Sequence, residues 1–394
     1  MIESIMAKSE HHIDTQLQHL GLSPDDNHGI PNPPIYRTST ILSSSMAQHR
    51  KETPKPFDYG RIGTPTSAAF EKSVAALYGA DDCISTPSGL SAISTAFLSA
   101  CEAGSHLLVP DSLYGSARRF VEKTLSKFGV EITFYPPRIN EQITSLFQEN
   151  TSVIYIESPG SLTFELQDIR KIIEIAKKHN ITTLCDNTWG TALHYPVLEY
   201  GIDIVIEAGT KYIAGHSDTN LGIAAASGAH AKNLRQTARN FGICAGPEDL
   251  YLGLRGLRTL RLRLEQSAAN GIALATALSG HKSVTAMLHP ALETSQDHAL
   301  YKRDFSGPCG LFGVIIDANI SQSAIDKAVE EMSIFRIGDS WGGYESLIKQ
   351  AHLSPAMRAH APEMPEGHLL RFYTGLEHSS DIIDDAVNML NKLG

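Results

Sequence analysis

The sequence has few cysteines and no spacing typical of a metal site. Its 394 residues include only five cysteines, and no two of them form a Cys-x-x-Cys pair. These features exclude a disulfide framework or a zinc ribbon as the basis of the fold. The 17 histidines form no His-Glu-x-x-His motif, which is the helical spacing of many zinc enzymes. We therefore expect reduced thiols and no metal ion.

Long apolar runs and an excess of positive charge are also lacking. No stretch approaches the ~20 apolar residues that a membrane-spanning helix needs, and residues 1–20 contain no continuous apolar region of the kind found in a secretory signal. The formal charge of −10 disfavours a nucleic-acid partner. We expect a cytoplasmic protein that acts on a small molecule, with neither a membrane nor a nucleic acid as partner. Four arginines at helical spacing are interpreted as structural ion pairs: Arg255, Arg258, Arg261 and Arg263.

By composition the chain divides into three parts. Residues 1–58 are polar and rich in proline, and a segment of this kind cannot bury a core of its own. We interpret it as an extended N-terminal arm that docks on a second subunit of a homo-oligomer. Because 394 residues exceed one ordinary core, we expect a large domain at 59–254 and a smaller C-terminal α/β domain at 255–394.

Apolar strand-like segments alternate with helical ones over most of the chain. Thr64 followed by Pro65 predicts the start of a helix. The alternation that follows predicts an α/β fold with a mainly parallel central sheet covered on both faces. The expected strands lie at 107–109, 132–135, 153–156, 181–185, 204–206 and 222–226, with two more near 312–316 and 369–373.

Lys211 and Asp186 each follow an expected strand, and the ends of such strands are where sites usually form. Lys211 lies among small residues, so desolvation would lower the pKa of its ammonium group and make it an amine nucleophile. Asp186 is placed to pair with a protonated ring nitrogen. Taken singly, the lysine is more often a solvated loop residue and the aspartate a helix N-cap. Together they are the pairing found in pyridoxal phosphate enzymes.

A phosphate site is expected where residues 86–92 open a helical run, since small residues there leave backbone N–H groups for an anion. On this segment alone a serine N-cap is the simpler interpretation. The chain has neither a Walker motif nor a Gly-x-Gly-x-x-Gly motif, which weakens a dehydrogenase assignment.

Three other side chains suit the same ligand. Tyr114 follows a strand and could stack on a flat ring, although it could equally be a half-buried loop tyrosine. Arg61, beside Tyr59, could bind phosphate or simply be a surface arginine. Arg371 lies inside an apolar strand-like run, where its charge needs an anion such as an α-carboxylate.

Seven motifs, taken in the order in which they occur along the chain, resemble the Cys/Met-metabolism family of pyridoxal phosphate enzymes. The resemblance runs from about residue 33 to residue 377. It implies an aspartate-aminotransferase-like (fold type I) subunit, assembled as a homotetramer whose active sites are shared between two subunits. The motifs are Tyr59-Gly60-Arg61, Ser88-Gly89-Leu90, Asp111-Ser112-Leu113-Tyr114-Gly115, Asp186-Asn187-Thr188-Trp189, Thr210-Lys211-Tyr212, Gly215-His216-Ser217-Asp218 and Ser340-Trp341-Gly342-Gly343-Tyr344-Glu345-Ser346.

The resemblance also implies roles for individual residues around pyridoxal 5'-phosphate. Lys211 would bind the cofactor covalently and Asp186 would hold its pyridine nitrogen. Tyr114 would stack on the ring and, with Lys211, act in catalysis. The backbone N–H groups of Gly89 and Leu90 would bind the phosphate.

The remaining implied roles concern the phosphate and the substrate. The Thr210 hydroxyl would bind the phosphate, joined by Tyr59 and Arg61 of the neighbouring subunit. Arg371 would hold the α-carboxylate of a sulfur amino acid, helped by Ser340 and Trp341.

Many members of the family have serine where this chain has Ala208, so one phosphate hydroxyl is absent. Two other positions favour the β-lyase branch. Methionine γ-lyases resemble each other in a cysteine where this chain has Ser116, and the γ-synthase and γ-lyase branches usually show Ser-Leu-Gly-Gly-Val where residues 340–344 read Ser-Trp-Gly-Gly-Tyr. The resemblance thus implies β-elimination of L-cystathionine, a step of methionine biosynthesis. The sequence leaves open γ-elimination or γ-replacement, a broader cysteine-conjugate β-lyase and a cofactor-binding scaffold.

Overall fold

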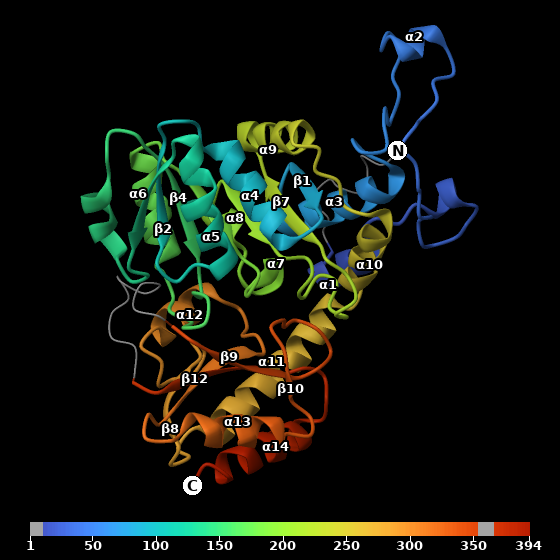
Figure 1. Cartoon of the computed structure of the whole chain (residues 1–394). Coiled ribbons are helices and arrows are strands. Elements are labelled where there is room, and N and C mark those ends of the chain that lie inside the picture. The colour runs from blue at the N-terminus through green and yellow to red at the C-terminus, as the bar shows by residue number, and fades with distance from the viewer. Residues whose placement is uncertain (1–10, 354–365) are drawn as a thin grey trace.

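The computed structural model describes residues 11–353 and 366–394, which form an α/β subunit with two sheets (Figure 1). The larger, seven-stranded sheet has the order β1-β7-β6-β5-β4-β2-β3. Its pairs are parallel except for the two that involve β7. This confirms the predicted mainly parallel sheet. The strands are β1 (Asp82–Thr86), β2 (His106–Pro110), β3 (Glu131–Tyr135), β4 (Thr151–Glu157), β5 (Thr182–Asp186), β6 (Ile204–Glu207) and β7 (Gly222–Ala226).

Both faces of this sheet are buried, because successive apolar side chains of a strand point to opposite faces. In β2, Leu108 packs into one core cluster, whereas Leu107 and Val109 pack into the other. The first cluster is covered by α3 (Pro65–Tyr78), α6 (Ile169–Lys178), α10 (Pro247–Leu257) and the start of α11 (Leu260–Leu278). The second is covered by α4 (Gly89–Ala100), α5 (Gly115–Lys123) and α9 (Gly228–Asn240).

The start of α3 confirms the cap predicted from the sequence. The Thr64 side chain accepts a hydrogen bond from the Ser67 N–H, Pro65 occupies the first turn, and Gly79 ends the helix with φ 65°. A glycine adopts this left-handed conformation without the steric cost that a Cβ would add.

The smaller, five-stranded sheet has the order β10-β11-β12-β9-β8 and is mostly antiparallel. The long helix α11 runs from the body of the larger sheet to this one and packs against α14 (Figure 1). The predicted domain boundary near residue 254 stays a prediction. The elements are β8 (Val284–Leu288), β9 (Leu311–Ile316), β10 (Arg336–Ile337), β11 (Leu347–Ala351), β12 (His368–Tyr373), α12 (His298–Asp304), α13 (Gln322–Glu330) and α14 (Ser379–Asn391).

The N-terminal segment differs in part from the expected extended arm. Helix α1 (Ile13–His19) docks on its own subunit, with Leu17 and Leu20 in the core. Arg258 donates hydrogen bonds to the carbonyls of these two leucines, and Arg261 pairs with Asp14. The arginine cluster therefore makes carbonyl bonds as well as the expected ion pairs. Beyond α1, only short elements interrupt the segment, namely η1 (Pro24–Asn27) and α2 (Met46–His49).

Short helices complete the loops of the larger body: η2 (Leu125–Phe128), η3 (Asn140–Leu146), α7 (Thr191–His194) and α8 (Val197–Tyr200). Within residues 11–353 and 366–394, no helix is long and apolar enough to cross a membrane. Over the same residues, no three His, Cys, Asp or Glu side chains gather as a metal ion would require.

Candidate active site

Lys211 lies in the loop that follows β6, and the part of the chain that carries the smaller sheet covers it. Its Nζ donates a hydrogen bond of 2.8 Å to the Ser340 hydroxyl and lies 5.6 Å from the centre of the Trp341 ring. Burial lowers the pKa of Lys211 to about 8; the charge of Arg371 lowers it further and that of Asp339 opposes both. The structure thus contains an amine that loses its proton more readily than an ordinary lysine.

Asp186 ends β5, the strand beside β6. Its Oδ1 accepts bonds from both the N–H (2.9 Å) and the hydroxyl (2.6 Å) of Thr188, so Oδ2 carries neither bond. Burial raises the pKa of Asp186, and the two bonds from Thr188 counteract that rise. Thr188 also accepts a bond of 2.9 Å from the Ala208 N–H, which ties the carboxylate to the lysine loop.

The N-terminus of α4 meets the same loop. Gly89 and Leu90 are its first two residues, and N–H groups in this position have no partner within a helix. A Cβ on Gly89 would lie 2.7 Å from the Cβ of Ala208, so only glycine allows this approach. The Thr210 hydroxyl donates to the Leu221 carbonyl (3.0 Å) and accepts from the Leu221 N–H (2.8 Å). It would have to give up its present acceptor to bind a phosphate.

Tyr114 is 46% exposed and immediately precedes α5. Its backbone N–H donates a bond of 2.7 Å to the carboxylate of Glu157. Glu157 ends β4 and pairs in register with Asp186. The tyrosine is therefore held at the same edge of the sheet as Asp186, with its ring free on one side.

Arg371, on β12, is 8% exposed and holds the segment that covers Lys211. Its Nη2 donates to the carbonyls of Asp339 (2.8 Å) and Ser340 (3.0 Å), so Nη1 and Nε carry neither bond. Burial lowers the pKa of Arg371 to about 10, while the charges of Asp339 and Tyr114 raise it. The guanidinium stays charged at neutral pH, and its charge acts on the lysine amine.

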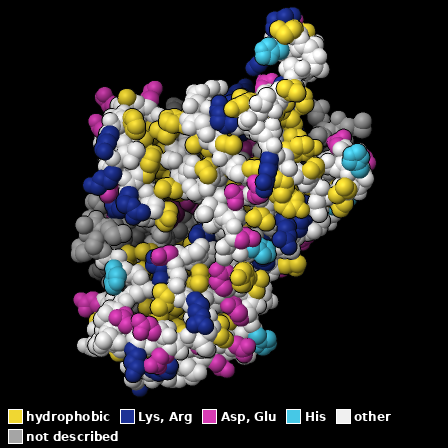
Figure 2. Space-filling model, turned by 45° about the vertical axis from the view of Figure 1, so that its right-hand side comes forward, with side chains coloured by type: hydrophobic (Ala, Val, Ile, Leu, Met, Phe, Trp, Pro, Cys, Tyr) yellow, Lys and Arg dark blue, Asp and Glu magenta, His cyan; other side chains and the backbone are white. Residues whose placement is uncertain are grey.

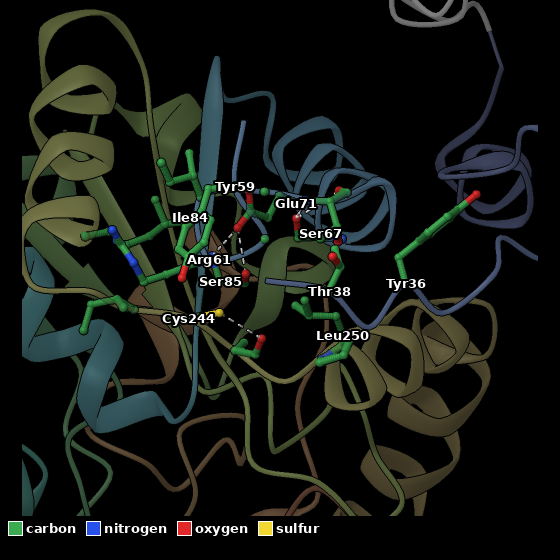
Figure 3. Close-up of a pocket in the computed structure, with 18 of the residues that line it drawn as sticks. Tyr36, Thr38, Tyr59, Arg61, Ser67, Glu71, Ile84, Ser85, Cys244 and Leu250 are labelled. Atoms are coloured by element: carbon green, nitrogen blue, oxygen red, sulfur yellow. Dashed lines mark hydrogen bonds between the residues drawn. The ribbon is translucent and has the colours of Figure 1, made fainter. Parts of the chain in front are cut away.

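Tyr59 and Arg61 lie elsewhere in the subunit. They line a cavity of about 640 Å³ between the N-terminal segment, α9 and the start of α10, and none of the residues described above for the lysine site lines it (Figure 3). The Arg61 guanidinium donates a bond of 3.0 Å to the Arg239 carbonyl and lies 5.9 Å from the centre of the Tyr59 ring. Within one chain these two residues are thus separate from the lysine site.

Glu207, the last residue of β6, is 1% exposed and lies behind the lysine loop. It accepts a bond of 2.5 Å from the Tyr78 hydroxyl. Burial raises its pKa to about 8; the tyrosine bond lowers the pKa and the charge of Asp186 raises it. The folded protein therefore holds a neutral carboxyl group here at neutral pH.

A buried amine of lowered pKa, a carboxylate whose Oδ2 takes no bond from Thr188 and the first N–H groups of a helix meet at one sheet edge. This set fits pyridoxal phosphate, which carries an aldehyde, a protonated ring nitrogen and a phosphate dianion. The fold and the site thus define a pyridoxal-phosphate-dependent enzyme of fold type I.

Comparison with known proteins identifies the family. The model of the Cys/Met metabolism PLP-dependent enzymes matches residues 14–391, and the chain belongs to that family. It is 40% identical over 376 residues to a putative cystathionine beta-lyase of Rhizobium johnstonii, covering 95% of this chain and 94% of that protein. It is 37% identical over 382 residues to the L-alanine/L-glutamate racemase of Wolbachia pipientis wMel, covering 94% of each chain.

A solved structure agrees with this assignment. Cystathionine gamma synthase from Xanthomonas oryzae pv. oryzae, in complex with aminoacrylate and cysteine, superposes with a TM-score of 0.91 at 28% identity. The match covers 98% of this chain and 99% of that one. The resemblance seen in the motifs and the fold type I assignment are both confirmed, and the cofactor is pyridoxal phosphate.

Several residues of the site had not been singled out from the sequence. Thr188 lies inside a motif that was singled out, but its role as a link between Asp186 and Ala208 depends on strand pairing. Glu157 carried no signal beyond its position at the end of an expected strand. Ser217 and Glu345 each belong to a matched motif, yet their mutual hydrogen bond joins residues 128 positions apart.

Proposed function

We propose that the chain is a carbon–sulfur lyase that acts on L-cystathionine by β-elimination, releasing homocysteine, pyruvate and ammonia. The observation that carries this proposal is the buried Lys211 amine, 2.8 Å from Ser340 and beside the charge of Arg371. Relatives with this activity in their names support the choice of reaction, for example the cystathionine beta-lyase of Bordetella avium, 36% identical over 394 residues.

In the proposed reaction, Arg371 binds the α-carboxylate of the substrate through the guanidinium nitrogens that do not bond to Asp339 and Ser340. This fixes the Cα–H bond toward Nζ of Lys211. The bound cofactor supplies the electron sink for the pair left at Cα. Asp186 would keep the ring nitrogen of that cofactor protonated, and Tyr114 would pack on the ring.

Lys211 then moves one proton. Its neutral amine takes the proton from Cα as general base and delivers it to the departing sulfur as general acid, so homocysteine leaves as the thiol. The Cβ–S bond breaks, and addition of one water to the remaining three-carbon fragment gives pyruvate and ammonia. Ser340, which accepts a hydrogen bond from Nζ in the structure, would hold the freed amine in place between these steps.

The products of L-cystathionine test this proposal. The purified holoenzyme should release pyruvate and homocysteine in equal amounts. If 2-oxobutyrate and cysteine appear instead, the enzyme is a γ-lyase and the proposed bond cleavage is wrong.

Racemisation is the second candidate, because one relative of 37% identity is named as an L-alanine/L-glutamate racemase. The same lysine proton transfer at Cα would support it if the proton returned to the opposite face. Incubation with L-alanine in deuterated water, followed by chiral chromatography, distinguishes the two. The lyase proposal predicts that D-alanine forms from L-alanine at no more than about one hundredth of the rate at which pyruvate is released from L-cystathionine.

We also propose a cytoplasmic homotetramer in which Tyr59 and Arg61 complete the phosphate site of a neighbouring subunit. Hydrophobic side chains gather on the surface beneath the N-terminal segment that projects at the top of Figure 2. Within that segment Leu42 is 85% exposed and Met46 is 64% exposed. Burying such side chains against a second copy would remove apolar surface from water. The same contact would bring the cavity lined by Tyr59 and Arg61 (Figure 3) toward the lysine site of the second copy.

A further inference from the structure

The segment that covers Lys211 is pressed closely on the lysine loop. A Cβ on Gly342 would lie 2.8 Å from Cα of Lys211, and a Cβ on Gly343 would lie 2.2 Å from Oγ of Ser217. Gly342 therefore lies directly on the backbone of Lys211, and Gly343 lies on the side chain of Ser217. The ring of Trp341 meets that of Tyr212 edge-on at 5.7 Å, so the segment and the loop fit together along several residues.

Two side-chain hydrogen bonds join these parts. In one, Nζ of Lys211 donates to Ser340. In the other, the Ser217 hydroxyl donates a bond of 2.6 Å to Oε1 of Glu345. The first bond involves the reacting amine and must break when Lys211 binds the cofactor or moves a proton. The second bond involves no reacting atom.

The covering segment is also fixed from its own side. The Tyr373 hydroxyl on β12 donates a bond of 2.7 Å to the Gly343 carbonyl, and the Leu376 N–H donates to the Tyr344 carbonyl at 2.8 Å. These bonds hold the segment on the smaller sheet but do not connect it to the lysine loop. Once the lysine has left Ser340, the serine–glutamate pair adds a hydrogen bond to the packing contacts that join the segment to the loop.

We propose that the Ser217–Glu345 hydrogen bond is a latch that keeps Ser340 and Trp341 over Lys211 while the amine is engaged in the reaction. Both residues are positioning residues, because neither touches the reacting atoms. The inference rests on the proposed function of Lys211. Arg371 donates hydrogen bonds to this segment and would also bind the substrate carboxylate. Loss of the latch should loosen the segment and should therefore weaken substrate binding more than it slows the proton transfer.

Ser217→Ala in the holoenzyme tests the latch most cleanly. Ser217 has φ 57°, and alanine keeps the same Cβ in this left-handed conformation, so the substitution removes only the hydroxyl. Ser333→Ala is the matched control, since the Ser333 hydroxyl also bonds a carboxylate, that of Asp385 at 2.9 Å, in an exposed loop beside α14.

With L-cystathionine, Ser217→Ala should raise KM roughly tenfold and change kcat less than about threefold, because the segment that helps to bind the substrate loses a hydrogen bond to a charged group. Glu345→Gln keeps an acceptor oxygen and should raise KM less. The double variant S217A/E345Q should add little to S217A alone, since the bond is already absent in S217A. Ser333→Ala should leave both constants unchanged, and the melting temperatures of S217A and S333A should agree.

Wild-type KM and kcat in Ser217→Ala would overturn the latch, as would a loss of kcat with KM unchanged. Failure of the underlying function is a different result. In that case the Lys211→Ala variant would itself still turn over L-cystathionine.

Discussion

At the scale of single residues, the chemistry depends on the protonation state of Lys211. Its pKa is about 8 because it is buried and because Arg371 is near. A lysine amine attacks an aldehyde only when neutral. Cofactor-free protein should therefore bind pyridoxal phosphate covalently at a rate that rises from about pH 7 to about pH 9 and then levels off. Stopped-flow absorbance measures this rate. A rate that still climbs beyond about pH 10 would show an ordinary lysine.

Glu207 gives a second prediction at this scale, for stability. Its folded pKa of about 8 exceeds the ordinary value of 4.5, so between these values the folded protein keeps a proton that the unfolded chain has lost. The contribution of the Glu207 carboxyl group to the free energy of unfolding is complete below its ordinary pKa of 4.5. It falls by about 1.4 kcal/mol per pH unit from there to about pH 8.

Glu207→Gln cannot ionise, so its stability relative to wild type should grow from about pH 5 to about pH 8, up to a few kcal/mol. Urea unfolding at several pH values measures the difference, with the exposed Glu199→Gln as control. A difference that is constant over this range would show that the carboxyl group is already ionised in the folded protein.

At the scale of secondary-structure elements, the cofactor site depends on how closely α4 approaches the lysine loop. Gly89→Ala would place a Cβ 2.7 Å from that of Ala208, and the helix would have to move away. We expect the Kd for pyridoxal phosphate to rise roughly tenfold or more, because the N–H groups that face the phosphate would shift. Gly115→Ala, at the start of α5 with no atom within 4 Å of the added Cβ, is the control. Equal Kd values for both variants would contradict the proposed phosphate site.

Most of the strands that could be predicted from the sequence are buried on both faces. Strands β2, β4 and β6 contain nearly continuous apolar runs, and such runs carry a strong signal. Burial alone does not decide the outcome, because β3 was predicted and is only partly buried, whereas β1 is almost fully buried and was missed. Strand β8 was missed because it is only half-buried. Strand β11 was missed because it contains Lys349 and Gln350. These strands are defined by pairing with distant segments, for which the local sequence has no pattern.

The candidate site shows the same limit. Lys211 and Asp186 could be found because each directly follows a recognisable strand. The bond from Lys211 to Ser340 joins residues 129 positions apart, so no local spacing could reveal it. Helix α1 was expected to be part of an extended arm, but Leu17 and Leu20 pack on their own subunit. The apolar residues that make this contact, Ile13, Leu17 and Leu20, were too few within a polar segment to predict it.

At the scale of the whole molecule, the placement of Arg61 in a separate cavity predicts shared active sites. Mixing unfolded Lys211→Ala and Arg61→Ala subunits and refolding them should restore about a quarter of wild-type activity, since half of the dimers are mixed and each mixed dimer has one intact site. Pyruvate release before and after mixing measures this. No restoration would mean that Arg61 acts within its own chain.

The central claim is that the Lys211 amine binds the cofactor and moves the proton at Cα. Its most direct test compares Lys211→Ala with wild type and with the exposed-lysine control Lys178→Ala, all supplied with pyridoxal phosphate and L-cystathionine. The account predicts that Lys211→Ala lacks the absorption band of the covalently bound cofactor and that its pyruvate release falls by about a thousandfold or more. Pyruvate release near the wild-type rate from Lys211→Ala would contradict it.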